Sequence, residues 1–305
     1  MHRRNVLKAA ATAAIGAGMG LSVTDQIKGE RLSAQRSTKT LIEMPFLRID
    51  NRIRLFFKEW GKGRPVVFIH GWAMNAEMWQ YQMIHLADRG MHCIAYDRRG
   101  HGRSSDPGTG YDYDTLADDL AVLLNQLDLR NVTLVGHSMA SGEIVRYLTR
   151  HGASRVSKAV MIATTTPFSL KTTDNPEGVD KAYFEQIRGA MLKDFPKWLY
   201  DNARPFFTPE TSPEMIQWGV TMCQQASLKA VIELNRVVTE TDFRSELSKI
   251  TVPALIIHGD KDVSAPLELT ARRTAKLIPK NQLKVYEGGP HGLFITHKER
   301  LNRDL

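Results

Sequence analysis

The sequence predicts an α/β fold, with a mostly parallel sheet flanked by helices and an inserted helical cap. Two observations support this fold class. From residue 41 onward, short apolar segments alternate with amphipathic helical segments, which is the pattern of parallel strands joined by crossover helices. About ninety residues separate two of the late strands, far more than a single crossover helix requires.

The predicted strands are short runs rich in Val, Ile and Leu, as expected of strands that are buried on both faces. They are Arg54–Trp60, Pro65–His70, His92–Asp97, Asn131–Gly136, Ala159–Ala163, Ala254–His258 and Leu283–Tyr286. The helical segments predicted between them are Ala76–Arg89, Asp114–Leu127 and Ser141–Arg150. Together these segments assign residues 41–305 to one domain.

The long connection is predicted to be a helical cap at about residues 168–250. Its aromatic side chains recur at helix-like spacing, and we expect most of them to form the core of the cap. They are Phe168, Phe184, Phe195, Trp198, Phe206, Phe207 and Trp218. The cap is expected to set the substrate preference, although it carries no recognisable motif.

Residues 1–40 are predicted to be an export signal followed by a linker. Arg3 and Arg4 precede an acid-free stretch dominated by Ala and Gly, which resembles a twin-arginine signal. This stretch is too weakly apolar for a membrane anchor. We therefore expect export to the periplasm or secretion, with no stable membrane insertion after export, and we leave the segment out of the fold.

Charge and composition exclude several kinds of partner. The net charge is +8, but seven Lys/Arg and two acids fall within residues 1–40, so the rest of the chain carries only +3. The absence of a dense basic stripe argues against nucleic acid. Dinucleotide, nucleotide and zinc-hydrolase motifs are missing, so no cofactor or metal is predicted. Cys93 and Cys223 are expected to be unpaired.

The run from Val132 to Ala140 predicts a nucleophile elbow at Ser138. An apolar strand leads into Gly-His-Ser-Met-Ala, and a helix follows. Such a sharp turn needs small residues two positions from the serine, and it aims the helix N–H groups at developing negative charge. Ala140 stands where the usual motif has Gly, and its methyl is tolerable if the neighbouring strand carries a small residue. A serine that merely caps the helix is the alternative.

Two later loops supply an acid and a base, in the order nucleophile, acid, histidine that is typical of this arrangement. Asp260 and Asp262 both follow the strand that ends at His258. Asp260 is suited to closing the turn, and Asp262 is better placed to reach a histidine. His291 stands in a Gly-rich loop after the last strand, at the same sheet edge as Ser138.

Two backbone N–H groups are candidates for binding an oxyanion. Met139 follows the nucleophile, and Trp72 lies in the loop after the strand Pro65–His70; both positions supply such donors in this architecture. The Trp72 side chain would then wall the substrate pocket. The turn Asp97–Ser104, with its glycines and arginines, is assigned a structural role.

These motifs together resemble the α/β-hydrolases, and more narrowly the bacterial arylesterases and cofactor-free (non-haem) haloperoxidases. The residues that carry the resemblance are His70-Gly71-Trp72, Asp97–Ser104, Gly136-His137-Ser138-Met139, His258–Asp262 and Pro290-His291-Gly292. It implies an α/β-hydrolase fold with an eight-stranded sheet, Asp262 as the triad acid, and Trp72 and Met139 as the oxyanion donors. The candidates for the substrate pocket are Trp72, Phe168 and Val263.

The chain departs from the family pattern in three places. Ala140-Ser141 replaces a Gly-Gly pair, which affects the packing of the helix after the elbow. The export leader is unusual for this branch. The chain also ends at Leu305, where relatives are expected to continue through a final helix.

The resemblance implies a serine hydrolase that cleaves small aryl esters through an acyl-enzyme and needs no cofactor. Hydrogen peroxide in place of water would yield a peracid, which oxidises halide without metal or haem. The alternatives are a lactonase or carbon–carbon bond hydrolase on the same triad, and a non-catalytic binding module, against which an intact triad argues. The expected partner is a small-molecule ester, and a homo-oligomer is left open.

Overall fold

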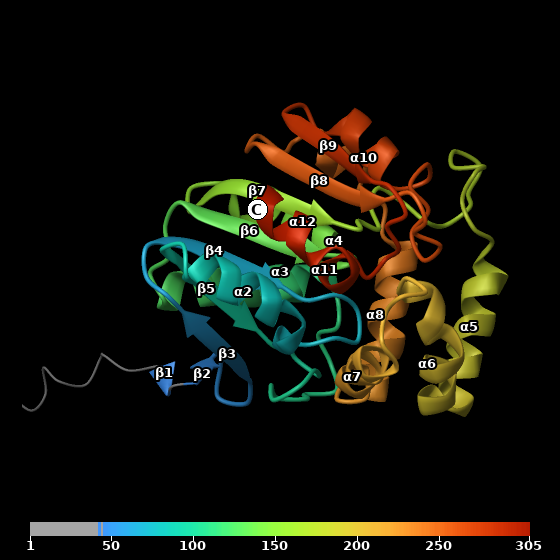
Figure 1. The fold of residues 1–305 in the computed structure, drawn as a ribbon, viewed down its shortest axis with the longest axis horizontal. Helices are drawn as coiled ribbons and strands as arrows, with labels where there is room; N and C mark the ends of the chain where they lie inside the picture. Colours follow the sequence, from blue (N-terminus) through green and yellow to red (C-terminus); the bar gives the residue numbers. More distant parts are fainter. Residues whose placement is uncertain (1–41, 44) are drawn as a thin grey trace, which may run out of the picture. The chain divides into compact units, whose positions relative to one another are not determined.

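A sheet of nine strands runs through the residues that the computed structural model describes, 42–43 and 45–305 (Figure 1). The spatial order is β1-β2-β3-β5-β4-β6-β7-β8-β9. The strands are β1 (Ile42–Glu43), β2 (Phe46–Arg48), β3 (Arg54–Trp60), β4 (Arg64–Ile69), β5 (Met91–Tyr96), β6 (Val132–His137), β7 (Val156–Ile162), β8 (Ala254–Gly259) and β9 (Asn281–Tyr286). The predicted export signal and linker lie outside the described residues.

Strands β4 to β9 are parallel, and β1 to β3 extend one edge in antiparallel pairing. The predicted mostly parallel sheet of eight strands is confirmed as β2 to β9, and β1 adds a strand of two residues at the edge. Strands β1 and β2 carry no recognisable sequence pattern, because they are only two and three residues long. All the strands predicted from apolar runs are present, with ends shifted by at most three residues.

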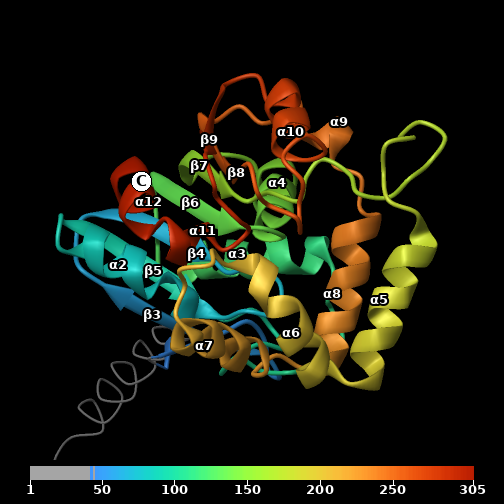
Figure 2. The same cartoon turned by 45° about the vertical axis from the view of Figure 1, so that its right-hand side comes forward.

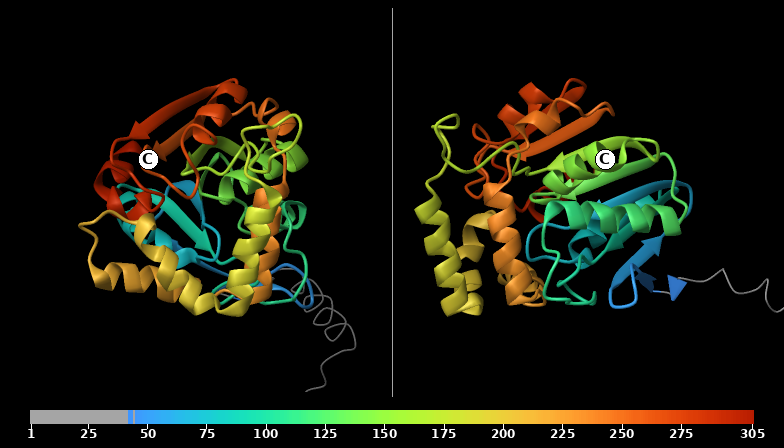
Figure 3. Two further views of the ribbon diagram at one scale, coloured as in Figure 1. Left: turned by 90° about the vertical axis from the view of Figure 1, so that its right-hand side faces the viewer. Right: turned by 180° about the vertical axis from the view of Figure 1, so that it is seen from behind.

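Helices cover both faces of the sheet (Figures 2 and 3). Alternate side chains of a strand point to opposite faces, so in β4 Val67 and Ile69 enter one core while Val66 and Phe68 enter the other. The first core lies under α3 (Tyr113–Gln126), α4 (Ala140–His151) and α10 (Ala271–Leu277), and the second under η1 (Ala76–Trp79), α2 (Gln80–Ala87), α11 (Leu293–Thr296) and α12 (Lys298–Asp304).

The connection from β7 to β8 forms a group of helices beside the carboxyl ends of the parallel strands, toward which the arrowheads of β7 and β8 point (Figure 1). This cap consists of α5 (Lys181–Lys193), α6 (Phe195–Ala203), η2 (Arg204–Phe206), α7 (Pro213–Cys223), α8 (Leu228–Glu240) and α9 (Arg244–Leu247). Helix α5 packs against α6 and α8. Buried side chains such as Met191, Phe195 and Val231 form a core of their own, and Trp72 from the sheet domain packs against it.

The end of the chain corrects one expectation. A last helix is present, because α12 extends to Asp304 and buries Leu301 completely. The Tyr286 hydroxyl of β9 donates to the Asp304 carboxylate over 2.6 Å and ties the helix to the sheet. Cys93 and Cys223 are both free, as predicted. Among the residues that the structure describes, no helix has the length and apolar character that crossing a bilayer requires.

Candidate active site

Ser138 occupies a sharp turn between β6 and α4. Its φ of 58° lies in the left-handed region that side chains rarely adopt, and its N–H donates to the Ile162 carbonyl over 2.8 Å. A Cβ added to Gly136 would lie 2.8 Å from Ile144 Cδ1 and 2.9 Å from Ala140 Cβ. The tight approach of helix to strand therefore explains why a glycine precedes the serine by two positions.

The Ala140 methyl is fully buried at the start of α4. It lies against Gly136 of β6, the strand that leads into the turn. The small residue that makes room for the alanine is therefore Gly136. Gly142, two positions after Ala140, is equally restricted, since a Cβ there would come within 2.6 Å of Tyr113 and 2.7 Å of Phe243.

The structure brings Ser138, His291 and Asp262 into one hydrogen-bonded row. His291 Nε2 lies 2.9 Å from Ser138 Oγ, and His291 Nδ1 lies 2.6 Å from Asp262 Oδ2. All three residues are buried, with exposed fractions of 6%, 5% and 4% for the serine, histidine and aspartate. The three residues come from different loops at the carboxyl edge of the sheet.

Asp262 is held by further donors in the loop after β8. Its Oδ1 accepts from the N–H groups of Ser264 and Ala265 at 2.9 and 2.8 Å, and His258 Nε2 lies 3.3 Å from Oδ2. Burial alone would raise the pKa of Asp262, but the His291 charge and the hydrogen bonds from His258 and His291 hold that pKa well below its usual range. The carboxylate therefore stays ionised.

Asp260 faces a different partner. Its Oδ1 accepts from the Gly288 N–H over 2.8 Å, and its own N–H donates to the Tyr286 carbonyl. These bonds join the loop after β8 to the loop after β9. Asp260 thus closes the turn, while Asp262 is the aspartate that contacts His291.

The backbone N–H groups of Trp72 and Met139 face no hydrogen-bond acceptor among the described residues. The Trp72 indole spans the gap to the cap, because its Nε1–H donates to the Val231 carbonyl of α8 over 2.9 Å. Its ring also meets Phe195 and Trp198 of α6 edge to face, with centroid distances of 6.3 and 5.8 Å. The loop that carries one free N–H is therefore fixed to the cap.

His137, the residue before the serine, has a role that its variable motif position did not indicate. Its Nε2 lies 2.9 Å from the His291 carbonyl, and the two rings pack with centroids 4.8 Å apart. Burial, together with the nearby His291 charge, lowers the pKa of His137 to about 3, so the ring is neutral and donates through Nε2. A Cβ on Gly71 would approach His137 Nδ1 to 2.6 Å, which accounts for that glycine.

The remaining pocket candidates lie in different surroundings. Phe168 is buried with the Arg244 guanidinium 5.2 Å above its ring. Val263 follows Asp262 and is 67% exposed. Phe206, which the sequence placed among the cap aromatics, lies with its ring 5.3 Å from the His291 ring, and its carbonyl accepts from the Gly292 N–H. Phe206 therefore joins the cap to the histidine loop.

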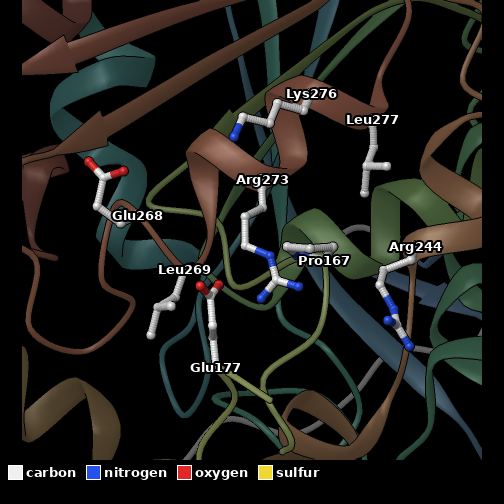
Figure 4. Close-up of a pocket in the computed structure, with 8 residues that line it drawn as sticks. All are labelled: Pro167, Glu177, Arg244, Glu268, Leu269, Arg273, Lys276 and Leu277. Carbon is white, nitrogen blue, oxygen red and sulfur yellow. The ribbon is translucent and has the colours of Figure 1, made fainter. Parts of the chain in front are cut away.

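A separate cavity of about 630 Å³ lies between the loop after β7 and the helices α9 and α10 (Figure 4). It is lined by Pro167, Glu177, Arg244, Glu268, Leu269, Arg273, Lys276 and Leu277. The hydrogen-bonded row of Ser138, His291 and Asp262 is not part of this lining. Arg244 pairs with Asp174 and Asp242, so its charge is already compensated.

Metal ligands are not gathered anywhere in the described part of the chain, since no group of three or more His, Cys, Asp or Glu side chains is arranged to hold an ion. The Asp97–Ser104 turn is held by hydrogen bonds within the turn and to the neighbouring η1 and α3. The Asp97 carboxylate accepts from the N–H groups of Ala76 and Arg103 at 2.8 and 2.9 Å, and Arg99 forms two hydrogen bonds with Asp119.

A mostly parallel sheet with helices on both faces, a serine elbow, and an acid and histidine on later loops of the same edge define the α/β-hydrolase class. Residues 64–217 match the family described as alpha/beta hydrolase fold. A non-heme chloroperoxidase from Kitasatospora aureofaciens is 40% identical over 271 residues, which cover 86% of this chain and 98% of that protein. A bifunctional esterase/perhydrolase from Acinetobacter calcoaceticus is 33% identical over 274 residues, with coverages of 86% and 98%.

Among solved structures, an esterase from Exiguobacterium antarcticum is similar with a TM-score of 0.82 and 34% identity, covering 85% of this chain and 96% of that chain. The chain therefore belongs to the α/β-hydrolase fold family, in the branch that holds esterases and non-heme haloperoxidases. It is an esterase-like enzyme, as the sequence predicted.

Proposed function

We propose that this protein hydrolyses small carboxylic esters, aryl esters in particular, through an acyl-enzyme formed on Ser138. The observation that carries the proposal is the row of hydrogen bonds from Ser138 Oγ through His291 to Asp262, at 2.9 and 2.6 Å. A serine hydroxyl is a weak nucleophile until a base accepts its proton, and His291 is within reach to do so.

In the first half-reaction, Ser138 Oγ attacks the ester carbonyl carbon and His291 Nε2 takes the hydroxyl proton. Asp262 accepts from His291 Nδ1–H, which fixes the tautomer that leaves Nε2 free to act as the base. The ionised carboxylate also stabilises the imidazolium that forms. His291 then gives the proton to the departing alkoxide, and the acyl group stays on Ser138.

The oxyanion of the tetrahedral intermediate would lie between the N–H groups of Trp72 and Met139. Each donor of this kind contributes about a hundred- to a thousandfold to kcat, because it acts on charge that exists only in the transition state. The dipole of α4, which begins at Ala140, adds positive potential at the same place.

In the second half-reaction, His291 removes a proton from water, and the resulting attack releases the carboxylic acid and restores Ser138. Hydrogen peroxide in place of water yields a peracid by the same proton transfers. The peracid then oxidises halide in solution, with no metal or haem. The similarity to a chloroperoxidase and to an esterase/perhydrolase supports this second acceptor.

The aromatic side chains beside the site support a preference for small aromatic esters. Trp72 and Trp198 pack edge to face, and Phe206 packs against His291 from the cap side. Rings of this kind bind flat apolar groups through area and edge-to-face geometry.

The experiment is a panel of aryl esters of graded acyl length, run with and without hydrogen peroxide, together with fluorophosphonate labelling. Wild-type protein should be labelled rapidly, and Ser138→Ala should lose labelling and at least a thousandfold in kcat. Ser141→Ala, which removes a buried serine hydroxyl from the first turn of α4, three residues after Ser138, is the matched control. Normal turnover by Ser138→Ala would remove the proposal.

We also propose export through the twin-arginine route, on the strength of Arg3 and Arg4 before a weakly apolar run. Replacing both arginines by lysine keeps the charge and should leave the protein in the cytoplasm. Cell fractionation that still finds the doubly substituted protein outside the inner membrane would contradict this proposal.

A further inference from the structure

Arg98 and Glu143 form an ion pair that is completely buried beside the site. The side chains of both residues have no exposed surface, and Arg98 Nε lies 2.5 Å from Glu143 Oε2. Arg98 lies just after β5, whereas Glu143 stands in the first turn of α4, five residues after Ser138. The Tyr96 hydroxyl donates to the other carboxylate oxygen of Glu143. Neither charged group contacts Ser138, His291 or Asp262.

The opposite side of Arg98 contacts the loop that carries Trp72. Arg98 Nη1 lies 3.4 Å from the Gly71 carbonyl oxygen and 3.0 Å from His70 Nδ1, and the Arg98 backbone N–H donates to His70 Nε2 over 3.0 Å. Because Nε2 accepts a hydrogen bond, the proton of the neutral His70 ring is on Nδ1, from which it is donated to the same Gly71 carbonyl over 2.8 Å. Burial and the Arg98 charge lower the pKa of His70 well below its usual value, which keeps the ring neutral.

The Gly71 carbonyl belongs to the same peptide group as the Trp72 N–H. A peptide is planar, so donors that fix its oxygen also fix the direction of its N–H. A hydrogen bond at one end of a peptide polarises the other end, and a cation does so more strongly than a neutral donor. We propose that Arg98, anchored by Glu143, is a positioning residue that aims and polarises the Trp72 N–H toward the oxyanion. This inference rests on the proposed ester hydrolysis.

The position of Glu143 links the ion pair to the second oxyanion donor, the Met139 N–H. Glu143 lies on α4, whose start carries the Met139 N–H, so the ion pair joins the element of one donor to the loop of the other. A buried ion pair is a poor source of stability, because the cost of desolvation can exceed the attraction. A role in setting the spacing of two catalytic donors explains why charges are retained where apolar side chains would fill the same space.

The test uses the full chain and replaces the pair by apolar residues of similar size, Arg98→Met with Glu143→Leu, so that no buried charge is left alone. We expect kcat for p-nitrophenyl acetate to fall by about ten- to a hundredfold, with KM changed by less than about threefold. The inhibition constant of a trifluoromethyl ketone, which forms an oxyanion adduct with the serine, should rise by the same factor as kcat falls. Tyr96→Phe removes a bond to Glu143 without touching the Gly71 carbonyl, and it is the matched control.

Arg98→Lys provides the second variant in case the double substitution prevents folding. A lysine keeps the positive charge, but its single ammonium lacks the planar fork that reaches both Glu143 and Gly71, so kcat should again fall without a matching rise in KM. A folded variant of either kind with kcat within threefold of wild type, or with ketone inhibition unchanged, overturns the inference. Wild-type protein that neither cleaves esters nor reacts with fluorophosphonate would instead overturn the proposed function.

Discussion

The carboxyl edge of the sheet and the helical cap contribute to the site in different ways. At the sheet edge, Ser138, Asp262 and His291 follow the ends of strands, and they are held by hydrogen bonds within their loops, to a neighbouring strand and to one another. The cap contributes through packing between distant segments, such as Trp72 against Trp198. The hydrogen-bonded row is therefore placed by strand ends, whereas the cap is joined to it by contacts between distant segments.

The sharpest test of the sheet edge compares its two neighbouring aspartates. Asp262→Asn should lower kcat by about a thousandfold or more, because the amide no longer fixes the His291 tautomer. Asp260→Asn should change kcat by less than tenfold and cost about 1 kcal/mol of stability, since only the bond from Gly288 weakens. Steady-state kinetics and urea unfolding of both variants decide the matter, and a reversal of the two effects would move the acid role to Asp260.

A second prediction concerns the neutral histidine that joins the elbow to the His291 loop. The pKa of His137 is about 3 when folded, below its usual 6.5, so between these pH values the unfolded chain binds a proton that the folded chain does not. The stability contribution is complete above pH 6.5 and falls as the pH drops, by about 1.4 kcal/mol per pH unit.

His137→Gln keeps an N–H donor near the His291 carbonyl and removes the titrating ring. Between pH 7 and pH 4.5, the free energy of unfolding of the variant should therefore fall by about 2 to 3 kcal/mol less than that of wild type. Urea unfolding at both pH values measures the difference. His70 and His101, whose pKa values are also lowered by burial, stay in both proteins and cancel. Parallel pH profiles for the two proteins would show that His137 is not the group concerned.

The cap side of the comparison is tested through Trp198. Trp198→Ala removes the ring that meets Trp72 and should lower kcat/KM for phenyl or benzyl esters by about fivefold, leaving esters without an aromatic ring, such as ethyl acetate, within twofold. Trp218→Ala is the control, because that cap tryptophan packs against Tyr81 instead. Equal losses of kcat/KM on all esters would mean that the cap affects the chemical step rather than the preference among substrates.

The smallest effect is expected for Ala140→Gly, which restores the usual motif. The Ala140 methyl fits against Gly136, and α4 begins at Ala140 in its presence. Removing the methyl should therefore lower the free energy of unfolding by at most about 1 kcal/mol and change kcat little. Thermal unfolding and steady-state kinetics measure both quantities. A tenfold rise in kcat at constant KM would reveal that the methyl misdirects the Met139 N–H.

The sequence predicted what depends on local rules. Apolar runs located β4 and β6 to within one residue at each end, because strands buried on both faces leave a continuous signal. The three residues of the hydrogen-bonded row followed from their order along the chain and from the loops in which they stand. The choice of Asp262 over Asp260 came from its place in the loop and mainly from the family resemblance; in the structure Asp260 accepts from the Gly288 N–H, and Asp262 contacts His291.

Contacts between distant segments could not be predicted from the sequence. His137 meets the His291 carbonyl across 154 positions, and the Trp72 indole meets Val231 across 159. Arg98 belonged to a turn with an obvious structural explanation, and nothing in its motif shows that its side chain reaches back to Gly71. The direction of a side chain depends on packing that sequence periodicity does not encode, so the contacts of these residues are visible only in the folded structure.

The hydrogen bond from the Trp72 indole to Val231 has a consequence for engineering and for divergence among relatives. Under the proposed function, Trp72 offers a backbone donor to the reaction and also holds a helix of the cap through its indole, so the two parts would not behave as interchangeable modules. A cap transplanted from a relative would need to present a backbone carbonyl where Val231 stands, or the loop beneath it would lose an anchor. Chimeras built without that carbonyl should change turnover along with selectivity.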